Sequence, residues 1–266
     1  MDQKDWIVAR PAGLASFGLT RRDLSSGALA AFSLALLGCE VSVAAPKQRM
    51  PARDWIERQG ELARALKGGE ISALAWMSEV ERLAGEIEGA QLMAEVDRAK
   101  VTQRALMPTN DPRKSSVLFL DQSGEPRRLG YAAALFDFEP DNVITPHGHM
   151  HMVSSHLVVD GAFRVRNYDR LRDEDGAMVI KPTRDYVAQT GSLSAMTSEK
   201  DNIHWFVPDG GPAMTFDVII SGTDPGMPEY KIEAVDPLAG QPLADGSILA
   251  PKIGFEESSQ KYSAAV

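Results

Sequence analysis

The spacing of apolar residues changes from a helical period to a strand period near residue 110. From Pro51 to about Ala105, apolar side chains recur every three to four residues, with a break at Gly68-Gly69. After Asn110-Asp111-Pro112, apolar and polar side chains alternate in short runs that turn-forming residues separate. We therefore expect two or three short helices laid against the outside of a following β-domain.

Eight of the alternating runs have the length and flanking turns of β-strands. Pairs such as Asp160-Gly161 and Thr190-Gly191 mark the corners between them. Short strands joined by Gly-containing corners are typical of a double-sheet roll or a small barrel. The expected strands are residues 116–121, 129–138, 150–159, 162–168, 178–180, 186–189, 203–207 and 214–220.

The first 45 residues have the pattern of an export signal. Arg21-Arg22 precede an uncharged run over residues 27–38, and small residues follow it. The run is too short to span a bilayer and fits the apolar part of a signal peptide, and the arginine pair resembles a twin-arginine signal. Residues 36–39 also resemble a lipoprotein-processing site, in which Cys39 would carry the lipid and attach the chain to a membrane. We expect an exported, periplasmic protein, with cleavage after Ala44 as the alternative to lipidation.

The pattern divides the 266 residues into four parts. They are the signal (1–45), a helical appendage (46–110), a β-barrel (111–224) and a Pro- and Gly-rich tail (225–266) that we expect to wrap the barrel and fray. A formal charge of −9 argues against nucleic acid and anionic membrane surfaces as partners. Cys39 is the only cysteine, which excludes an intrachain disulfide.

The histidines are concentrated in one part of the chain. Four of the five lie between residues 147 and 156, and the fifth is His204. Imidazole is the commonest side-chain ligand of transition metals. Residues two apart in a strand share a face, so His147, His149 and His151 can all point into a barrel. Two of them and His204 would supply three nitrogens and leave positions open for water, substrate or dioxygen.

This arrangement resembles the metal motif of the cupin superfamily. Common cupins carry His-x-His, then a Glu, a Gly seven residues beyond it, and a His on a later strand. Here Ser154 stands in place of the Glu, and Gly161 and His204 keep the spacing. A site without the Glu resembles the three-histidine thiol dioxygenases of the cysteine and cysteamine type. Residues 211–219, and Leu120-Asp121-Gln122 upstream, are also similar to runs in those enzymes, and the resemblance covers roughly residues 115–224.

The resemblance implies a cupin-like double-stranded β-helix, a jelly-roll barrel. Together with the helical period upstream, we expect a mainly β protein with an N-terminal α-helical appendage. It implies His147, His149 and His204 as metal ligands, with His151 and Ser154 as alternative ligands or as groups that orient a ligand ring. The implied metal is Fe(II), although Zn, Ni, Cu or Mn suit the same nitrogens.

The activity implied is that of a non-haem iron dioxygenase that oxidises a small-molecule thiol to a sulfinate with dioxygen. Two alternatives remain. One is a non-catalytic periplasmic cupin that binds a metal or a small ligand. The other is a cupin dioxygenase or isomerase that acts on a substrate other than a thiol.

The sequence departs from the thiol dioxygenases at the substrate site, so substrate-binding and catalytic residues are not assigned. The arginine that grips a carboxylate in the cysteine type is replaced by Val117, with Arg113 and Lys114 nearby. Ser221 stands where a tyrosine is expected. We expect His156, of opposite parity to the other three, to face away from the site. The remaining candidates are Tyr168, Tyr186 and Tyr230 as substitutes for that tyrosine, and Asp217 and Glu199, which we expect to be surface or strand-end carboxylates.

Overall fold

The computed structural model describes residues 49–103, 110–224, 226–227 and 230–263. The expected export signal, including Cys39, lies outside the described residues. Within those ranges, no helix combines the length and the apolar character needed to cross a bilayer.

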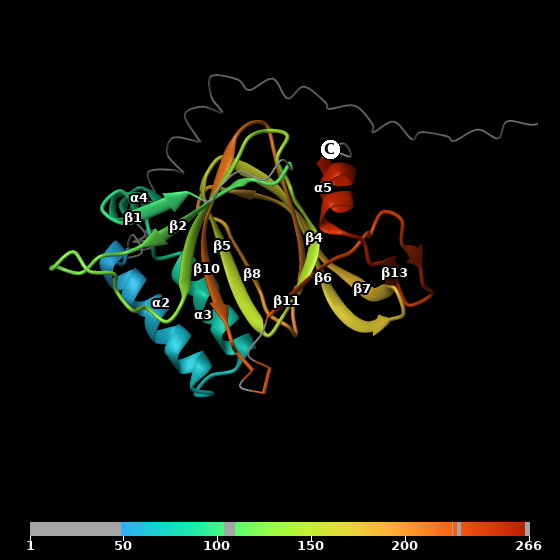
Figure 1. Cartoon of the computed structure of the whole chain (residues 1–266), viewed down its shortest axis with the longest axis horizontal. Helices are drawn as coiled ribbons and strands as arrows, with labels where there is room; N and C mark the ends of the chain where they lie inside the picture. The colour runs from blue at the N-terminus through green and yellow to red at the C-terminus, as the bar shows by residue number, and fades with distance from the viewer. Residues whose placement is uncertain (1–48, 104–109, 225, 228–229, 264–266) are drawn as a thin grey trace, which may run out of the picture. The chain divides into compact units, whose positions relative to one another are not determined.

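Eight consecutive strands form the centre of the fold. They are β3 (Ala132–Phe138), β4 (Ile144–Met150), β5 (Met152–Asp160), β6 (Ala162–Glu174), β7 (Ala177–Gln189), β8 (Leu193–Met196), β9 (Ile203–Pro208) and β10 (Ala213–Ser221). One sheet contains the order β3-β10-β5-β8, and the other contains β4-β9-β6-β7 (Figure 1). The pairings between these eight strands are all antiparallel. This strand order is the one obtained when a single long hairpin folds over to form two sheets. This is jelly-roll topology, and it confirms the predicted mainly β, cupin-like fold.

Five further strands extend the two sheets. β1 (Lys100–Gln103) and β2 (Arg113–Leu118) continue the first sheet beyond β3. β11 (Lys231–Ala234) pairs with β4, and β13 (Ile248–Pro251), which pairs with β12 (Gln241–Pro242), lies beside β7. The helical region predicted up to about Ala105 is therefore too long at its C-terminal end, because β1 begins at Lys100. The Pro- and Gly-rich tail adds ordered strands of two to four residues, which are too short to show a period.

Three helices pack against the outer face of the first sheet. They are α2 (Ala52–Lys67), α3 (Ala73–Ala84) and α4 (Gly89–Val96). Their apolar faces join the outward side chains of β5 and β10 in one buried cluster. The Trp55 ring meets Phe216 of β10 edge-on at 6.1 Å between centroids, and its indole N–H donates to the Leu83 carbonyl at 3.1 Å. The expectation of short helices outside a β-domain is confirmed.

The space between the two sheets is filled partly by apolar side chains. Phe138, Phe163 and Phe206 pack there as members of one cluster, with the Phe138 and Phe163 rings 4.8 Å apart. The turn from β5 to β6 requires glycine at position 161. Gly161 has a φ of +68°, and a Cβ there would lie 2.6 Å from the Pro212 carbonyl oxygen. Gly161, the glycine of the cupin-like spacing, thus allows the β5–β6 turn to pass close to the chain at Pro212.

The C-terminal helix α5 (Phe255–Ser263) lies on the outer side of the second sheet. Tyr262 packs edge-on against Trp205 of β9 at 4.8 Å, and its hydroxyl donates to Asp236 at 2.8 Å. Phe255, at the start of the helix, lies 5.9 Å from the His147 ring. The helix therefore adjoins the strand that carries two of the candidate ligands.

Candidate metal centre

The structure brings His147, His149 and His204 together between the sheets. His147 and His149 lie on β4, and His204 lies on the neighbouring strand β9 directly opposite His147. One ring nitrogen from each histidine can be chosen so that all three lie within 4.8 Å of one another. No Asp or Glu among the described residues joins this group. The arrangement is a three-histidine cluster that could hold a metal ion.

Each of the three rings uses its Nδ1 atom in a contact that leaves Nε2 for a metal. His147 Nδ1 donates to the Thr145 carbonyl at 2.8 Å. The Nδ1 atoms of His149 and His204 lie 3.0 and 3.1 Å from the thioether sulfurs of Met152 and Met196. A donor role at Nδ1 fixes the tautomer with a lone pair on Nε2, as in known metal sites.

The Nε2 atom of His149 is buried and has no hydrogen-bond partner among the described residues. A buried polar atom without a partner is costly to the folded state. A divalent transition metal, which forms bonds of about 2.0–2.1 Å to imidazole nitrogen, would satisfy it. The donor set therefore fits such an ion.

Burial keeps the imidazoles in the neutral form that binds metal. Loss of solvation lowers the pKa of His147 to about 4. The same cause, together with the neighbouring histidines, lowers the pKa of His149 and of His204 well below the ordinary value of 6.5. All three nitrogens are thus available at neutral pH without competition from protons.

Asn202 ties the two ligand-bearing strands together. Its amide Nδ2 donates to the His149 carbonyl at 2.5 Å and to the Thr197 carbonyl at 3.1 Å. This contact explains the glycine between the two histidines, because a Cβ on Gly148 would lie 2.7 Å from Asn202 Oδ1. The Gly in His-Gly-His thus permits the approach of the loop that precedes His204.

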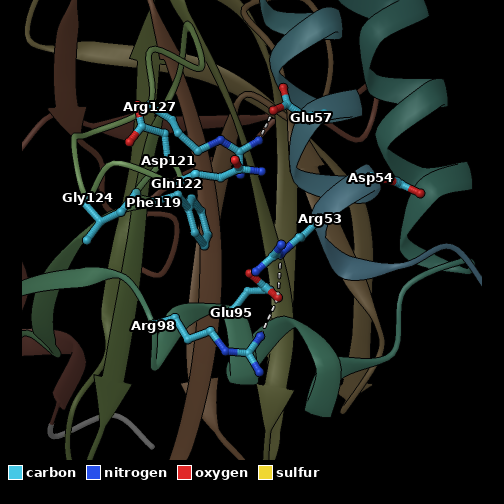
Figure 2. Close-up of a pocket in the computed structure, with 11 residues that line it drawn as sticks. Arg53, Asp54, Glu57, Glu95, Arg98, Phe119, Asp121, Gln122, Gly124 and Arg127 are labelled. Carbon is cyan, nitrogen blue, oxygen red and sulfur yellow. Dashed lines mark hydrogen bonds and ion pairs between the residues drawn. The ribbon is translucent and has the colours of Figure 1, made fainter.

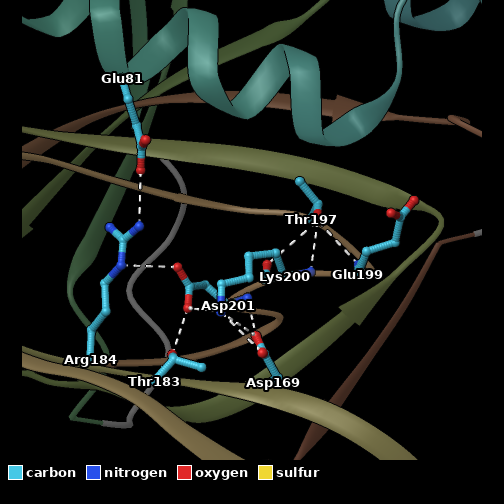
Figure 3. Close-up of polar contacts among 8 residues, drawn as sticks. All are labelled: Glu81, Asp169, Thr183, Arg184, Thr197, Glu199, Lys200 and Asp201. Atoms are coloured by element: carbon cyan, nitrogen blue, oxygen red, sulfur yellow. Dashed lines mark hydrogen bonds and ion pairs between the residues drawn. The ribbon is translucent and has the colours of Figure 1, made fainter.

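A buried carboxylate fixes the same loop (Figure 3). Asp201 has no exposed surface and a left-handed φ of +49°. Its carboxylate accepts from the Thr183 hydroxyl at 2.5 Å and lies 3.2 Å from Arg184 Nε, while its backbone N–H donates to Asp169 at 2.8 Å. Arg184 reaches on to Glu81 of α3 at 3.2 Å. The start of the strand that carries His204 is therefore linked to β6, β7 and a helix.

Ser154, His156 and Asp217 form a buried hydrogen-bonded chain on the opposite wall. Asp217 Oδ2 accepts from His156 Nδ1 at 2.7 Å, and His156 Nε2 lies 2.9 Å from the Ser154 hydroxyl. The His156 ring lies 4.9 Å from the His204 ring. Ser154, where cupins have Glu, thus directs its hydroxyl to a histidine in the same wall.

Two expectations about these residues are wrong. His156 was expected to face away from the site, and Asp217 was expected at the surface or at a strand end. His156 faces inward because it lies on β5, in the other sheet, so parity counted along β4 does not apply to it. Asp217 is fully buried on β10 opposite His156. Glu199 is exposed, as expected.

His151 lies outside the three-histidine group. Its φ of +60° ends β4 and breaks the alternation that would have aligned it with His147 and His149. Its Nδ1 instead lies 3.4 Å from a carboxylate oxygen of Asp224. Sequence reasoning did not identify Asn202, Met152 or Met196, because their contacts join positions far apart in the chain and follow no period.

A hollow of about 540 Å³ lies apart from the histidine cluster, on the helical side of the fold (Figure 2). Arg53 and Arg98 converge on Glu95 at 3.3 and 2.7 Å, and Arg127 pairs with Glu57. The run Leu120-Asp121-Gln122, which is similar to a run in the cysteine-type enzymes, lines this hollow. The hollow is built from paired charges on α2, α4 and the β2–β3 turn, and none of the histidines lines it.

Comparisons with known proteins give likeness in structure alone. No protein-family model and no curated protein sequence matches the chain. The similar solved structures include a sugar phosphate isomerase of the cupin superfamily, from Silicibacter pomeroyi. It has 17% sequence identity to this chain and a TM-score of 0.35, and the alignment covers 57% of this chain and 87% of that chain.

An oxalate oxidase aligns with 19% identity and a TM-score of 0.33 over 51% of this chain and 60% of the other. The capsular polysaccharide assembling protein CapF of Staphylococcus aureus aligns with 14% identity and a TM-score of 0.33 over 50% of this chain. The aligned part spans only 31% of CapF. Cupin superfamily proteins are thus among the structural neighbours, and the fold assignment rests on the strand order itself.

Proposed function

We propose that the protein is a metal-dependent dioxygenase that oxidises a small thiol to a sulfinate, with Fe(II) held by His147, His149 and His204. The observation that carries this proposal is the composition of the cluster, which contains three imidazoles and no carboxylate among the described residues. Three neutral ligands leave a divalent ion its full charge, which favours an anionic ligand such as a thiolate. Three protein ligands also leave coordination positions open.

Side chains around the cluster suit a reaction that must exclude bulk water. His204 is 1% exposed, and the Phe206 ring lies 5.6 Å from it. The Thr145 carbonyl and the Met152 and Met196 sulfurs hold the three rings in place through Nδ1. Ser154 adds no negative charge where common cupins carry a Glu, and the buried carboxylate on the opposite wall, Asp217, is hydrogen-bonded to His156.

A bound ferrous ion would supply a Lewis acid for the thiolate and a redox-active centre at which dioxygen can react with sulfur. Overall, a thiol and one dioxygen give a sulfinate and a proton. The O–O bond breaks and two S–O bonds form, and the S–H proton leaves to solvent. Sulfur loses four electrons, and the two oxygen atoms gain them, so no further reductant is needed.

The test is oxygen uptake by the purified, Fe(II)-loaded protein with cysteamine, cysteine and 3-mercaptopropionate in turn. We expect one of these thiols to consume one dioxygen per sulfinate formed, with sulfinate measured by mass spectrometry. A His204→Ala variant should lose the activity, whereas a His151→Ala variant should keep it.

The alternatives give different results in the same assay. A protein that binds iron but consumes no oxygen with any thiol would contradict the proposal and favour a non-catalytic role. Oxygen uptake with a diketone or another oxygen-ligand substrate, without thiol turnover, would place the reaction among the other cupin activities.

We also propose that the protein is exported through residues 1–45. Cell fractionation should find it in the periplasm, and replacing Arg21-Arg22 by lysines should retain it in the cytoplasm. An unchanged distribution in that variant would contradict a twin-arginine route. A lipid on Cys39 would appear as membrane attachment that a Cys39→Ala variant loses.

A further inference from the structure

A buried amide occupies the same row of the second sheet as two of the candidate ligands. His147 of β4 lies opposite His204 of β9, and His204 in turn lies opposite Asn167 of β6. Residues directly opposite each other in a sheet project from the same face, with Cβ atoms about 4.5–5.5 Å apart. Asn167 therefore stands beside His204 on the face that carries the cluster.

The burial pattern of β6 independently directs Asn167 inward. Phe163 and Val165 belong to the apolar cluster between the sheets, whereas Arg164 and Arg166 alternate with them and are more exposed. Asn167 continues the inward series and is 1% exposed. It is thus a buried polar group in the wall of the space between the two sheets.

Within the described ranges, neither polar atom of the Asn167 amide has a hydrogen-bond partner. Both Nδ2 and Oδ1 are buried and make no hydrogen bond to the described residues. A buried amide can both donate and accept, and leaving both capacities unused destabilises the folded protein. What distinguishes Asn167 from other buried amides is its position beside His204, where it can bond a molecule held at the centre.

We propose that Asn167 is a substrate-binding residue, whose amide hydrogen-bonds the polar group of a small thiol that is held at the three-histidine centre. The inference rests on the proposed function, and it names the residue that would distinguish thiols with an amine or a carboxylate a few bonds from sulfur from simple alkyl thiols. An amine would donate to Oδ1, and a carboxylate would accept from Nδ2. A simple alkyl thiol makes neither bond.

The experiment measures thiol binding to the Co(II)-loaded full chain under anaerobic conditions, followed by thiolate-to-cobalt absorption. The probes are cysteamine, 3-mercaptopropionate and ethanethiol. Asn167→Leu should raise the Kd for cysteamine or for 3-mercaptopropionate about threefold to tenfold, the loss expected for one hydrogen bond, and should leave the Kd for ethanethiol unchanged. The thiol that is affected identifies the polar group.

Gln59→Leu is a matched control. Gln59 is also a fully buried amide whose two polar atoms have no partner among the described residues, but it lies on α2, in the helical layer. This variant should bind every probe as the wild type does. Asn167→Ser provides a second test that keeps a small polar group if the leucine variant does not fold, and it should weaken the same probe.

The outcomes separate the two proposals. If the wild-type chain binds no Co(II), or binds it and takes up no thiol, the proposed function fails. If Co(II) and the thiols bind normally and both Asn167 variants keep the wild-type Kd values, only the role of Asn167 is overturned. An equal loss for all three thiols would also overturn it, because that result indicates a general distortion of the centre.

Discussion

Gly148→Ala tests whether the contact between the two ligand strands is as close as the structure requires. The added Cβ would lie 2.7 Å from Asn202 Oδ1 and 3.0 Å from Ile203 Cγ1. Relief by rotation of Asn202 would break its hydrogen bonds to the His149 and Thr197 carbonyls. We expect a cost of about 1–3 kcal/mol, the usual range for overpacking a tight site. For a domain of this size, that corresponds to a fall in Tm of roughly 2–12 °C.

The assay is thermal unfolding of the metal-free protein, followed by a titration with Co(II). Because Gly148 lies between two candidate ligands, the alanine variant should also bind Co(II) more weakly. Gly89→Ala is the control, since a Cβ at Gly89 would meet nothing within 4 Å at the start of α4. If Gly148→Ala unfolds at the same temperature as Gly89→Ala and binds Co(II) as tightly as the wild type, the close approach is refuted.

Three further predictions concern pH, the loop before β9 and the C-terminal helix. Burial lowers the pKa of His147 in the folded protein to about 4, whereas its ordinary value in the unfolded chain is 6.5. The contribution of His147 to stability is therefore full above pH 6.5. It is lost as the pH falls from 6.5 towards 4, because only the unfolded chain takes up the proton in that range. Urea titrations of metal-free protein should show this decline, and a His147→Asn variant should show a shallower one. Asp201→Leu should lower the free energy of unfolding by about 2–4 kcal/mol. Asp201→Asn should cost less, because asparagine tolerates the left-handed backbone at this position. Equal losses for the two variants in denaturant unfolding would contradict this reasoning. Tyr262→Phe removes the hydrogen bond to Asp236 and should cost about 1–2 kcal/mol in the same assay, whereas no loss would show that the bond does not hold α5.

The fold could be predicted from the sequence because burial is periodic. Alternating apolar residues identified most of the central strands. Their Gly-containing corners indicated a double-sheet roll or small barrel, and the resemblance to cupins implied the jelly roll. The strand β4 was not among the expected runs, because Pro146 and Gly148 interrupt the alternation of apolar residues along it. The strand β8 and the C-terminal strands were also missed, since a run of four residues or fewer holds too few repeats to define a period. The strand at Lys100 was missed because exposed residues with no apolar alternation form it.

The cluster of His147, His149 and His204 could be predicted because it needs only two strands. Residues two apart in a strand share a face, which pairs His147 with His149, and the cupin-like spacing adds His204. The groups around them could not. Whether His151 continues the row depends on its backbone angle, and whether His156 faces inward depends on which sheet holds β5. Asn167 and Asn202 bear no local signal, since their position beside the histidines follows from cross-strand register and loop packing.

The most direct test of the central claim is the transition-metal content of the purified protein, measured by plasma mass spectrometry after loading with Fe(II) and removal of free ion. The account predicts about one ion per chain, lost in both His149→Ala and His204→Ala and kept in His151→Ala. Retention of a full equivalent by the His149 and His204 variants, or the absence of bound metal in the wild-type chain, would contradict it.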